Sequence, residues 1–562
     1  MAEPGHEILI KDAIVFLFAA GVAVPVFRYL KLPAVVGFML SGIALGPYAL
    51  GSLSHNYPIL EFVSISEPEA AAPFAELGVL FLLFLLGLEF SFEKLWALRR
   101  AVFGSDRVYE GIDGRHLKTL MNEVVAISRR SRDDGNRFWG RISGTEYEAL
   151  TADWSKRKFR ALGLEDIRTQ EFELGRQWFP IDWSLSATGA GQTLEFVSAN
   201  PATRSTALPD GLEAEAVWVG LGTAADFVGR DVQGKAVIIQ SILAPGQMGN
   251  SASWEGATIR ARERGASMVI GIWGYAGNLS VWQSLRAFQM IRDSDGTSRY
   301  VSQGVDLPGF FMGWEDGQRL RDLVGSGESV TISAQLDIEW REGLVSPSIF
   351  ATLPGTTDEK IYVMAHMDGY YDAALDNASG MAVMISLAEH FAQIPAEQRR
   401  RDIIFIGTAG HHVGSPNATY LRDMGMLENT ALMINCEHIA PTQFVQFNNE
   451  LRLTTTVSPR RWWVHGSDKL LDITLDAYQT FGVTLIGEMD GRATGEMMAI
   501  DKDAPSVQLI RSPEHKHTDG DVPELVPSAG LEAVARAYAK IIDEVNQLDI
   551  AQLTRPVLSS GR

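Results

Sequence analysis

Histidines and carboxylates gather at a few points in the second half of this 562-residue chain, and most of these points follow an apolar run. One run ends in His366-Met367-Asp368, and Asp376 follows in a turn rich in Ala, Ser and Gly. Later runs lead into His411-His412 and into Glu437-His438, and a downstream loop carries His515-Lys516-His517. Imidazoles and carboxylates at the ends of successive strands of an open α/β sheet are typical of a metal site. The competing interpretation is a set of histidines scattered over the surface.

These residue types suit zinc, which binds imidazole nitrogen and carboxylate oxygen. His366 offers a neutral imidazole, and Asp368 can accept its other N–H and fix its tautomer. Asp376 lies in a turn, where one carboxylate can face two cations, while Glu437 and His517 supply a further oxygen and nitrogen. Zinc held in this way keeps a position open for water and lowers the pKa of that water, so hydrolysis of an amide is the expected chemistry.

Buried strands and the helices beside them must position these side chains. Apolar residues before His366, at 403–406 and up to Ile434 predict three such strands. The apolar spacing also predicts helices, at residues 117–130, 145–162, 381–391 and 533–545. His438 and His515 are expected to be core or solvated histidines, and Asp521 is expected to cap a helix after Pro523 rather than to orient His517.

Length and charge narrow the class of protein. A chain of 562 residues is long enough for three or four domains. Its net charge of -20 makes nucleic acid an unfavourable partner, because phosphates repel an acidic surface. Cys436 is the single cysteine, which excludes an internal disulfide framework.

The first hundred residues have a different character. Residues 13–27, 32–50 and 70–90 are apolar, and each segment approaches the ~20 residues that cross a bilayer. We therefore expect three transmembrane helices, which insert the chain into a membrane through residues 8–91. A cleaved signal peptide is the competing interpretation of the first segment, and a buried soluble hairpin is the alternative for all three.

Basic residues set the expected orientation of these segments. Arg28 and Lys31 lie between the first and second segments, and Lys94, Arg99 and Arg100 follow the third. The positive-inside rule then places the N-terminus outside and the chain after the third segment in the cytoplasm. A multi-pass membrane location is the resulting prediction.

Two stretches of this region, residues 30–51 (LKLPAVVGFMLSGIALGPYALG) and 76–104 (ELGVLFLLFLLGLEFSFEKLWALRRAVFG), resemble the start of the monovalent cation:proton antiporters of the potassium-efflux type. The resemblance stops at Gly104. The ion-binding acidic residues of that family lie in later spans, so the resemblance does not imply transport. Cation:proton antiport is therefore the least favoured of the functions considered. Two interpretations stay open: a membrane anchor on an enzyme, and the joining of two unrelated reading frames.

A second resemblance concerns the middle of the chain. The pattern GKAVII at residues 234–239, a helix ending in RGASMVIG and then LPGFFM looks like the protease-associated (PA) domain inserted in many exopeptidases. We therefore predict these domains: 1–104 antiporter-like fragment, 105–190 first part of the peptidase domain, 191–338 inserted β-rich PA-like domain, 339–548 catalytic core and 549–562 tail.

The predicted ligands themselves carry the third resemblance. HMD, then ALDNASG, then an acidic residue after IN, then HTDGD resemble the M28 family of dinuclear zinc exopeptidases, over residues 105 to about 548. The resemblance implies an α/β fold with a mixed central sheet flanked by helices, and a peptide substrate. It also implies His366, Asp376 and Glu437 on one zinc, with Asp376 bridging to a second zinc held by position 412 and His517.

One departure from the family bears directly on activity. The family has Glu-Glu where this chain has His411-His412, and the first glutamate is its general base. His412 can serve as a zinc ligand. His411 is the expected base, with Asp368 as the second catalytic residue, but an imidazolium beside two cations is repelled. We expect weak catalysis, altered metal preference or a single zinc, and the alternative function is an M28-like binding or scaffold module.

Overall fold

The computed structural model describes residues 106–240, 253–275, 277–283, 287–292, 298–303, 306–447, 450–489, 491–511, 513 and 515–555, with positions 43, 50–53, 56 and 57. The chain divides into two compact units, Met1–Arg107 and Val108–Arg562. The first unit contributes helix α3 (Leu50–Leu53) and the start of η3 (Asp106–Tyr109). The predicted transmembrane segments otherwise lie outside the described residues. Within the described ranges, no helix is both long and apolar enough to span a bilayer.

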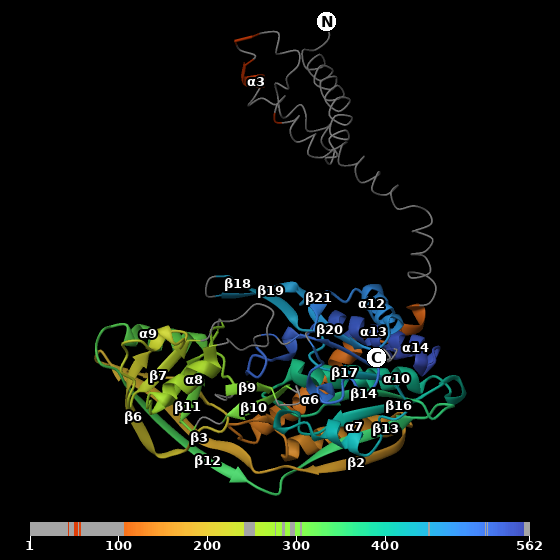
Figure 1. Cartoon of the computed structure of the whole chain (residues 1–562), viewed down its shortest axis with the longest axis horizontal. Helices are drawn as coiled ribbons and strands as arrows, with labels where there is room; N and C mark the ends of the chain where they lie inside the picture. The colour runs from red at the N-terminus through yellow and green to blue at the C-terminus, as the bar shows by residue number, and fades with distance from the viewer. Residues whose placement is uncertain are drawn as a thin grey trace, which may run out of the picture. The chain divides into compact units, whose positions relative to one another are not determined.

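The second unit contains a mixed eight-stranded sheet with helices on both faces, an α/β fold of the predicted kind (Figure 1). Its inner strands β16, β14, β17 and β22 run parallel to one another. Antiparallel pairing adds β13 and β2 on one side and β20 on the other, and β21 closes the edge. In sheet order the strands are β2 (Glu165–Glu173), β13 (Val345–Leu353), β16 (Asp402–Thr408), β14 (Lys360–His366), β17 (Thr430–Cys436), β22 (Ser506–Ile510), β20 (Arg460–His465) and β21 (Leu485–Glu488).

The inner strands read as continuous apolar runs because both of their faces are covered. Along β14, Ile361 and Val363 enter one core, whereas Tyr362 and Met364 enter the other. Five helices cover the first face: α6 (Gly114–Asp133), α7 (Glu146–Ala161), α10 (Ser379–Ala392), α12 (Asp468–Thr480) and α13 (Ser528–Asn546). Helix α11 (Pro416–Asp423) and the turn η8 (Gly495–Met497) lie on the second face. The four helices predicted from apolar spacing correspond to α6, α7, α10 and α13.

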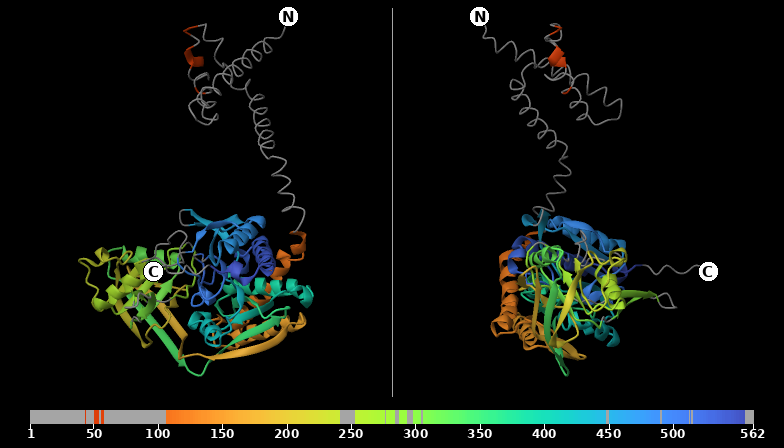
Figure 2. Two further views of the ribbon diagram at one scale, coloured as in Figure 1. Left: turned by 45° about the vertical axis from the view of Figure 1, so that its right-hand side comes forward. Right: turned by 90° about the vertical axis from the view of Figure 1, so that its left-hand side faces the viewer.

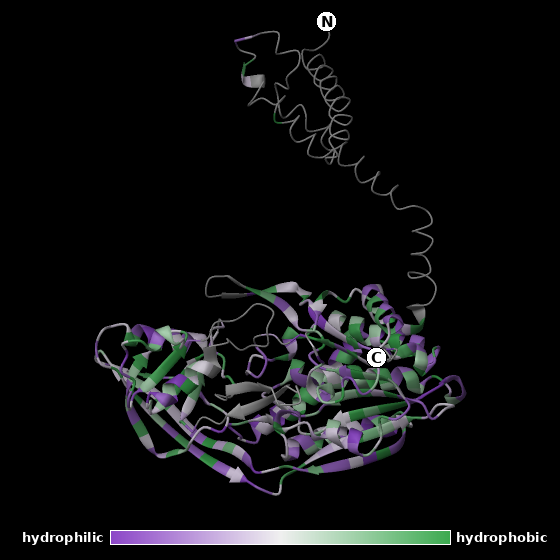
Figure 3. Ribbon diagram, in the orientation of Figure 1, coloured by the Kyte–Doolittle hydropathy of each residue, from purple (hydrophilic) through white to green (hydrophobic). Residues whose placement is uncertain are grey.

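A second eight-stranded sheet has its own cores on its two faces. In sheet order it consists of β4 (Gln192–Glu195), β3 (Gln177–Gly189), β12 (Thr331–Arg341), β6 (Leu208–Trp218), β7 (Ala236–Gln240), β8 (Met268–Ile272), β11 (Gly309–Met312) and β5 (Asn200–Pro201). Helices α8 (Ser253–Glu263) and α9 (Trp314–Val324) belong to this part of the chain. Figure 3 shows hydrophobic and hydrophilic residues alternating along β12, as expected for a strand with one solvated face.

The chain passes between the two sheets twice, from β2 into β3 and from β12 into β13, and Figure 2 shows these long strands running from one sheet to the other. Three short pairs complete the strands: β1 (Gly140–Arg141) with β15 (Gly369–Tyr370), β9 (Ala287–Arg292) with β10 (Ser298–Gln303), and β18 (Thr442–Phe447) with β19 (Glu450–Val457). The remaining short helices are η4 (Ala225–Phe227), η5 (Ala374–Ala378), η6 (Ala396–Gln398), η7 (His411–Val413), η9 (Pro523–Leu525) and α14 (Ile550–Leu553).

The topology explains why distant residues meet. Parallel strands β14, β16 and β17 present their carboxyl ends at the same edge of the central sheet. His366 is the last residue of β14, His411 begins the turn after β16, and Glu437 directly follows β17.

Candidate metal centre

The Asp376 carboxylate lies at the centre of a group of imidazoles. Its Oδ1 atom is 3.0 Å from Nε2 of His366 and 2.9 Å from Nε2 of His438. Its Oδ2 atom is 2.9 Å from Nε2 of His517 and 3.7 Å from Nε2 of His412. The carboxylate is buried, and neither oxygen meets the geometry of a hydrogen bond. An anion that is close to four nitrogens but hydrogen-bonded to none fits a site that binds cations.

The other nitrogens of two of these rings are already engaged. Nδ1 of His366 is 3.0 Å from the backbone oxygen of Asp368, and Nδ1 of His412 is 2.8 Å from an Asp368 carboxylate oxygen. Both oxygens can only accept, so both Nδ1 atoms carry a proton, and Nε2 is the ring atom that binds a metal when the imidazole is neutral. The sequence predicted that the Asp368 carboxylate fixes His366. That carboxylate is 3.4 Å from His366 Nδ1. It instead accepts hydrogen bonds from Nδ1 of His412 and from the backbone N–H groups of His411 and His412.

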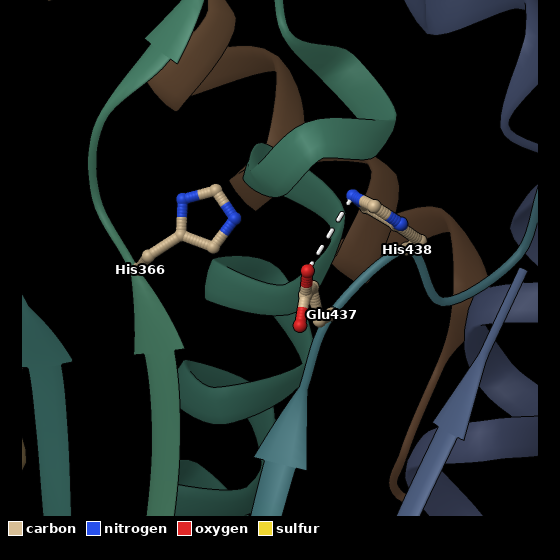
Figure 4. A group of neighbouring side chains, drawn as sticks. All are labelled: His366, Glu437 and His438. Carbon is tan, nitrogen blue, oxygen red and sulfur yellow. Dashed lines mark ion pairs between the residues drawn. The ribbon is translucent and has the colours of Figure 1, made fainter. Parts of the chain in front are cut away.

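Glu437 is held in one orientation. Its Oε2 atom accepts hydrogen bonds from Asn435 Nδ2 at 3.0 Å and Gln508 Nε2 at 3.2 Å. Its Oε1 atom faces the site, 3.8 Å from His438 Nε2 and 3.9 Å from His411 Nε2. Figure 4 shows Glu437 and His438, both at the end of β17, and His366, at the end of β14, gathered around one space.

The charges around Asp376 fix its protonation state. Burial alone would raise the pKa of Asp376, but the charges of His438 and Lys516 and the neighbouring His366 and His412 hold it well below its usual range. Burial and the charge of Lys516 hold the pKa of His517 well below its usual range, so this imidazole is neutral. An ionised carboxylate and a neutral imidazole are the forms in which these groups bind metal.

Three sets of donors in the described part of the chain are close enough to hold an ion, and two of them fit zinc, since Asp368 in the set with His366 and His412 is already engaged by Nδ1 of His412. The donor atoms of Asp376, His412 and His517 lie within 4.8 Å of one another, and so do those of His366, Glu437 and His438. The Nε2 atoms of His412 and His517 are 3.1 Å apart, a spacing that two facing lone pairs tolerate only with a cation or proton between them. The residue types match zinc ligands. The five predicted ligands therefore lie together, and His438 joins them.

His411 lies beside this group but is paired differently. Its Nδ1 atom is 2.8 Å from Oε1 of Glu496, and its ring stacks on that of His366 with centroids 3.9 Å apart. Burial would raise the pKa of Glu496, but the charge and hydrogen bond of His411 lower it to about 2, so Glu496 is an ionised acceptor. Nδ1 of His411 therefore carries a proton, and Nε2 is the acceptor when the imidazole is neutral.

Sequence reasoning missed Glu496 and undervalued His438. Glu496 lies in the short turn η8, away from any apolar strand run, so no pattern marks it. His438 follows a predicted ligand directly, and its fully buried ring is part of the cluster rather than of an apolar core. Asp521 also differs from expectation: it accepts hydrogen bonds from the backbone N–H groups of Leu375 and Asp376 at 2.8 and 3.1 Å. It therefore orients the turn that carries the central carboxylate, rather than capping a helix.

A cavity of about 450 Å³ opens beside the cluster, and His412 and His517 form part of its wall. Aromatic side chains from β3, from β15 and from nearby loops line most of the rest, namely Phe138, Trp178, Phe179, Trp282 and Tyr370. Trp282 stacks on Phe138 with centroids 4.0 Å apart, and its backbone N–H donates to the carbonyl of His517 at 2.8 Å. Gln177, Thr203 and Arg204 add polar groups. A peptide end fits a cavity of this size and lining.

Two family models match the chain. Residues 348–484, from within β13 to just beyond α12, match peptidase family M28, and residues 14–106 match the transmembrane sodium/hydrogen exchanger family. The resemblances to the cation:proton antiporters and to the M28 peptidases are thereby confirmed. The M28 match includes all the predicted ligands except His517.

Solved structures show the same fold. The aminopeptidase from Aneurinibacillus sp. strain AM-1 superposes with a TM-score of 0.52 at 17% identity, over 78% of this chain and 96% of its own. BSAP, a zinc aminopeptidase from Bacillus subtilis, gives 0.54 at 18% identity, over 79% and 98%. A peptidase M28 precursor from Shewanella amazonensis SB2B gives 0.57 at 16% identity, over 80% and 99%. The similarity thus covers most of this chain and nearly all of each neighbour.

Proposed function

We propose that this chain, which carries an M28 peptidase domain over residues 348–484, is a zinc-dependent exopeptidase of the aminopeptidase type. The observation that carries the proposal is the buried Asp376 carboxylate, with the Nε2 atoms of His366, His438 and His517 within 3.0 Å of its oxygens. His366, Asp376 and Glu437 would hold one zinc, and Asp376, His412 and His517 a second. Bound zinc would supply a Lewis acid for the peptide carbonyl and lower the pKa of the attacking water.

His411 would act as the proton acceptor through Nε2. Glu496 holds Nδ1 at 2.8 Å, so the ring cannot turn away and its basic nitrogen stays on the side of Glu437. An imidazolium formed at His411 would be neutralised by Glu496, which offsets the repulsion from nearby cations. Glu496 thus replaces part of the negative charge that the His-His sequence removes.

The peptide would enter the aromatic cavity. Its lining favours a terminal residue with a large apolar or aromatic side chain, which would pack against Trp282 and Tyr370. Arg204, at the polar part of the wall, suits a carboxylate of a short peptide. The second sheet, which we propose to be a protease-associated domain, supplies much of this wall.

The test is hydrolysis of aminoacyl reporter substrates by the full-length chain in detergent with zinc present. We expect release of the reporter, and loss of release in His366→Ala and after chelation. The matched control is His465→Ala, which removes a half-buried histidine from β20 outside the cluster. Hydrolysis that survives His366→Ala would contradict the proposal.

A second candidate function is a binding or scaffold module that retains the fold without useful catalysis. The His411-His412 sequence favours it, because the family's general base is a glutamate at this position. The two candidates differ in one observation: the module would retain zinc and bind peptide in the cavity, but would release no reporter.

We also propose that residues 8–91 attach the enzyme to a membrane, with the residues after them on the cytoplasmic side. The match of residues 14–106 to a transmembrane family supports the attachment. Membranes from cells expressing the chain should retain it after extraction at alkaline pH. Recovery of the intact chain in the supernatant would contradict the attachment.

A further inference from the structure

His438 differs from an ordinary core histidine in what its ring faces. The side chain is fully buried, and its Nε2 atom is 2.9 Å from Asp376 Oδ1 and 3.8 Å from Glu437 Oε1. Figure 4 shows a nitrogen of the His438 ring directed at Glu437, across the space from His366. An imidazole nitrogen that faces two carboxylates in a buried space has the position of a metal ligand.

The backbone holds this position at a cost. His438 has a φ of 48°, in the left-handed region that side chains with a Cβ avoid. This conformation turns the chain just after β17, so that Glu437 and His438, although adjacent in sequence, both direct their side chains into the site.

We propose that His438 is the fourth protein ligand of one metal ion, together with His366, Asp376 and Glu437. This inference rests on the metal centre of the proposed function and adds a difference between its two sites. Zinc sites with four protein ligands are closed, whereas sites with three keep a position open. The ion at His438 is therefore enclosed and tightly held. The ion at Asp376, His412 and His517 is the exchangeable one, next to the cavity.

The geometry supports this division. His366, Glu437 and His438 are each at most 2% exposed. The side chains of His412 and His517 are 8% and 21% exposed, and both line the cavity. Solvent and substrate thus reach His412 and His517 but not His366, Glu437 or His438.

The test is metal retention by the full-length chain in detergent, stripped with a chelator and reloaded with Zn²⁺ alone. After dialysis against a weak chelator, we expect one ion per chain in the wild type and in His517→Ala. In His438→Ala, we expect the retained ion to bind at least ~10-fold more weakly, the loss that follows removal of even an outer-shell partner. Loading the same proteins with Co²⁺ gives a spectrum that reports ligand geometry independently of activity.

His515→Ala is the matched control, because His515 is also a buried histidine beside the site but outside the donor sets. If His438→Ala does not fold, as judged by circular dichroism, His438→Gln supplies the same comparison with a side chain of similar size. Wild-type retention in a folded His438 variant would overturn the inference alone. Failure of the wild type to retain any ion would overturn the inference and the proposed metal centre together.

Discussion

At the scale of single residues, hydrogen bonds to Nδ1 leave Nε2 as the available nitrogen of three imidazoles in the metal centre. Asp368 fixes the proton of His412 on Nδ1 through its carboxylate and that of His366 through its backbone carbonyl. Glu496 does the same for His411. In each ring, Nε2 is then the atom that can bind a metal or accept a proton.

The role of the Glu496 carboxylate can be tested by a substitution that removes its charge and keeps its shape. Glu496→Gln keeps an oxygen near His411 Nδ1 but removes the charge that stabilises an imidazolium. General acid–base catalysis contributes about 10²–10⁴-fold, and the variant keeps His411 but weakens it as a base. We therefore expect kcat to fall by part of this factor, about 10–100-fold, while KM and zinc content stay unchanged. Initial-rate kinetics and metal analysis of the full-length chain measure these quantities.

Glu488→Gln, an exposed glutamate on β21, is the control for this change and should leave kcat as it is. Loss of zinc in Glu496→Gln would show instead that Glu496 supports the metal ligands rather than the base.

The sequence predicted the ligands that directly end strands or lie in recognisable turns, and these lie together in the structure. It could not predict Glu496, because the residue reaches His411 from a turn that only the tertiary fold brings to the sheet edge. It left His438 among core or solvated histidines, because only the turn of the backbone after Glu437 decides whether its ring enters the site.

At the scale of elements, the turn η8 and strand β17 must approach closely. Gly495 precedes Glu496 with a φ of 61°, and a Cβ built there would lie 2.1 Å from Glu437 Oε2 and 3.0 Å from Asn435 Nδ2. The missing side chain therefore lets η8 bring Glu496 to His411 while Glu437 keeps its two amide donors.

Gly495→Ala should displace Glu437 and lower the stability of the metal-bound protein. We expect a loss of about 1–3 kcal/mol, typical of overpacking, with weaker zinc retention. The matched control is Gly491→Ala, where φ is 79° but a Cβ meets nothing within 4 Å. Because backbone strain is common to both variants, the difference between their melting temperatures isolates the contact with Glu437. Equal melting temperatures and equal zinc retention would contradict this account.

Glu148 links three elements near the site. Located in α7, it accepts hydrogen bonds from Ser346 Oγ in β13 at 2.6 Å and from the backbone N–H groups of Gly144 and Gly410 at 2.7 and 3.2 Å. Burial and the charge of Asp368 nevertheless raise the pKa of Glu148 to about 8. The folded protein then binds a proton at Glu148 that the unfolded chain has lost above its ordinary pKa of about 4.3.

The sign of the pH dependence follows. Between the unfolded and folded pKa values the folded state holds more protons, so stability falls as pH rises from about 4.3 to 8, by at most about 1.4 kcal/mol per pH unit for one group. Glu148→Gln should flatten this part of the profile. Urea unfolding of wild type and variant across pH 4–8.5, with Glu146→Gln in the first turn of the same helix as control, measures the slope. An unchanged slope in Glu148→Gln would contradict the raised pKa.

At the scale of the whole molecule, the second unit joins two sheets at one cavity. The apolar runs of β14, β16 and β17 and the helices beside them were predictable, since each is a local pattern with both faces buried. The pairing of β3 with β12, and the side chains that meet across the two sheets, join residues more than a hundred positions apart and have no local signature.

A substitution at Trp282 tests whether the part of the chain that holds the second sheet helps to select the substrate. Its ring stacks on Phe138 and lines the cavity, and its backbone N–H donates to His517 in the metal cluster. Trp282→Ala keeps that backbone hydrogen bond but removes an aromatic wall, so the zinc content should stay the same. Loss of a stacking contact worth about 0.5–1.5 kcal/mol predicts a KM about 2–13-fold higher for substrates with an aromatic terminal residue, and a smaller rise for alanine. Trp340→Ala removes a half-exposed tryptophan of β12 that does not line the cavity, and should leave KM for both substrates unchanged. An equal rise in KM for both substrates in Trp282→Ala would contradict the prediction. It would mean that the cavity binds peptides without selecting the terminal side chain.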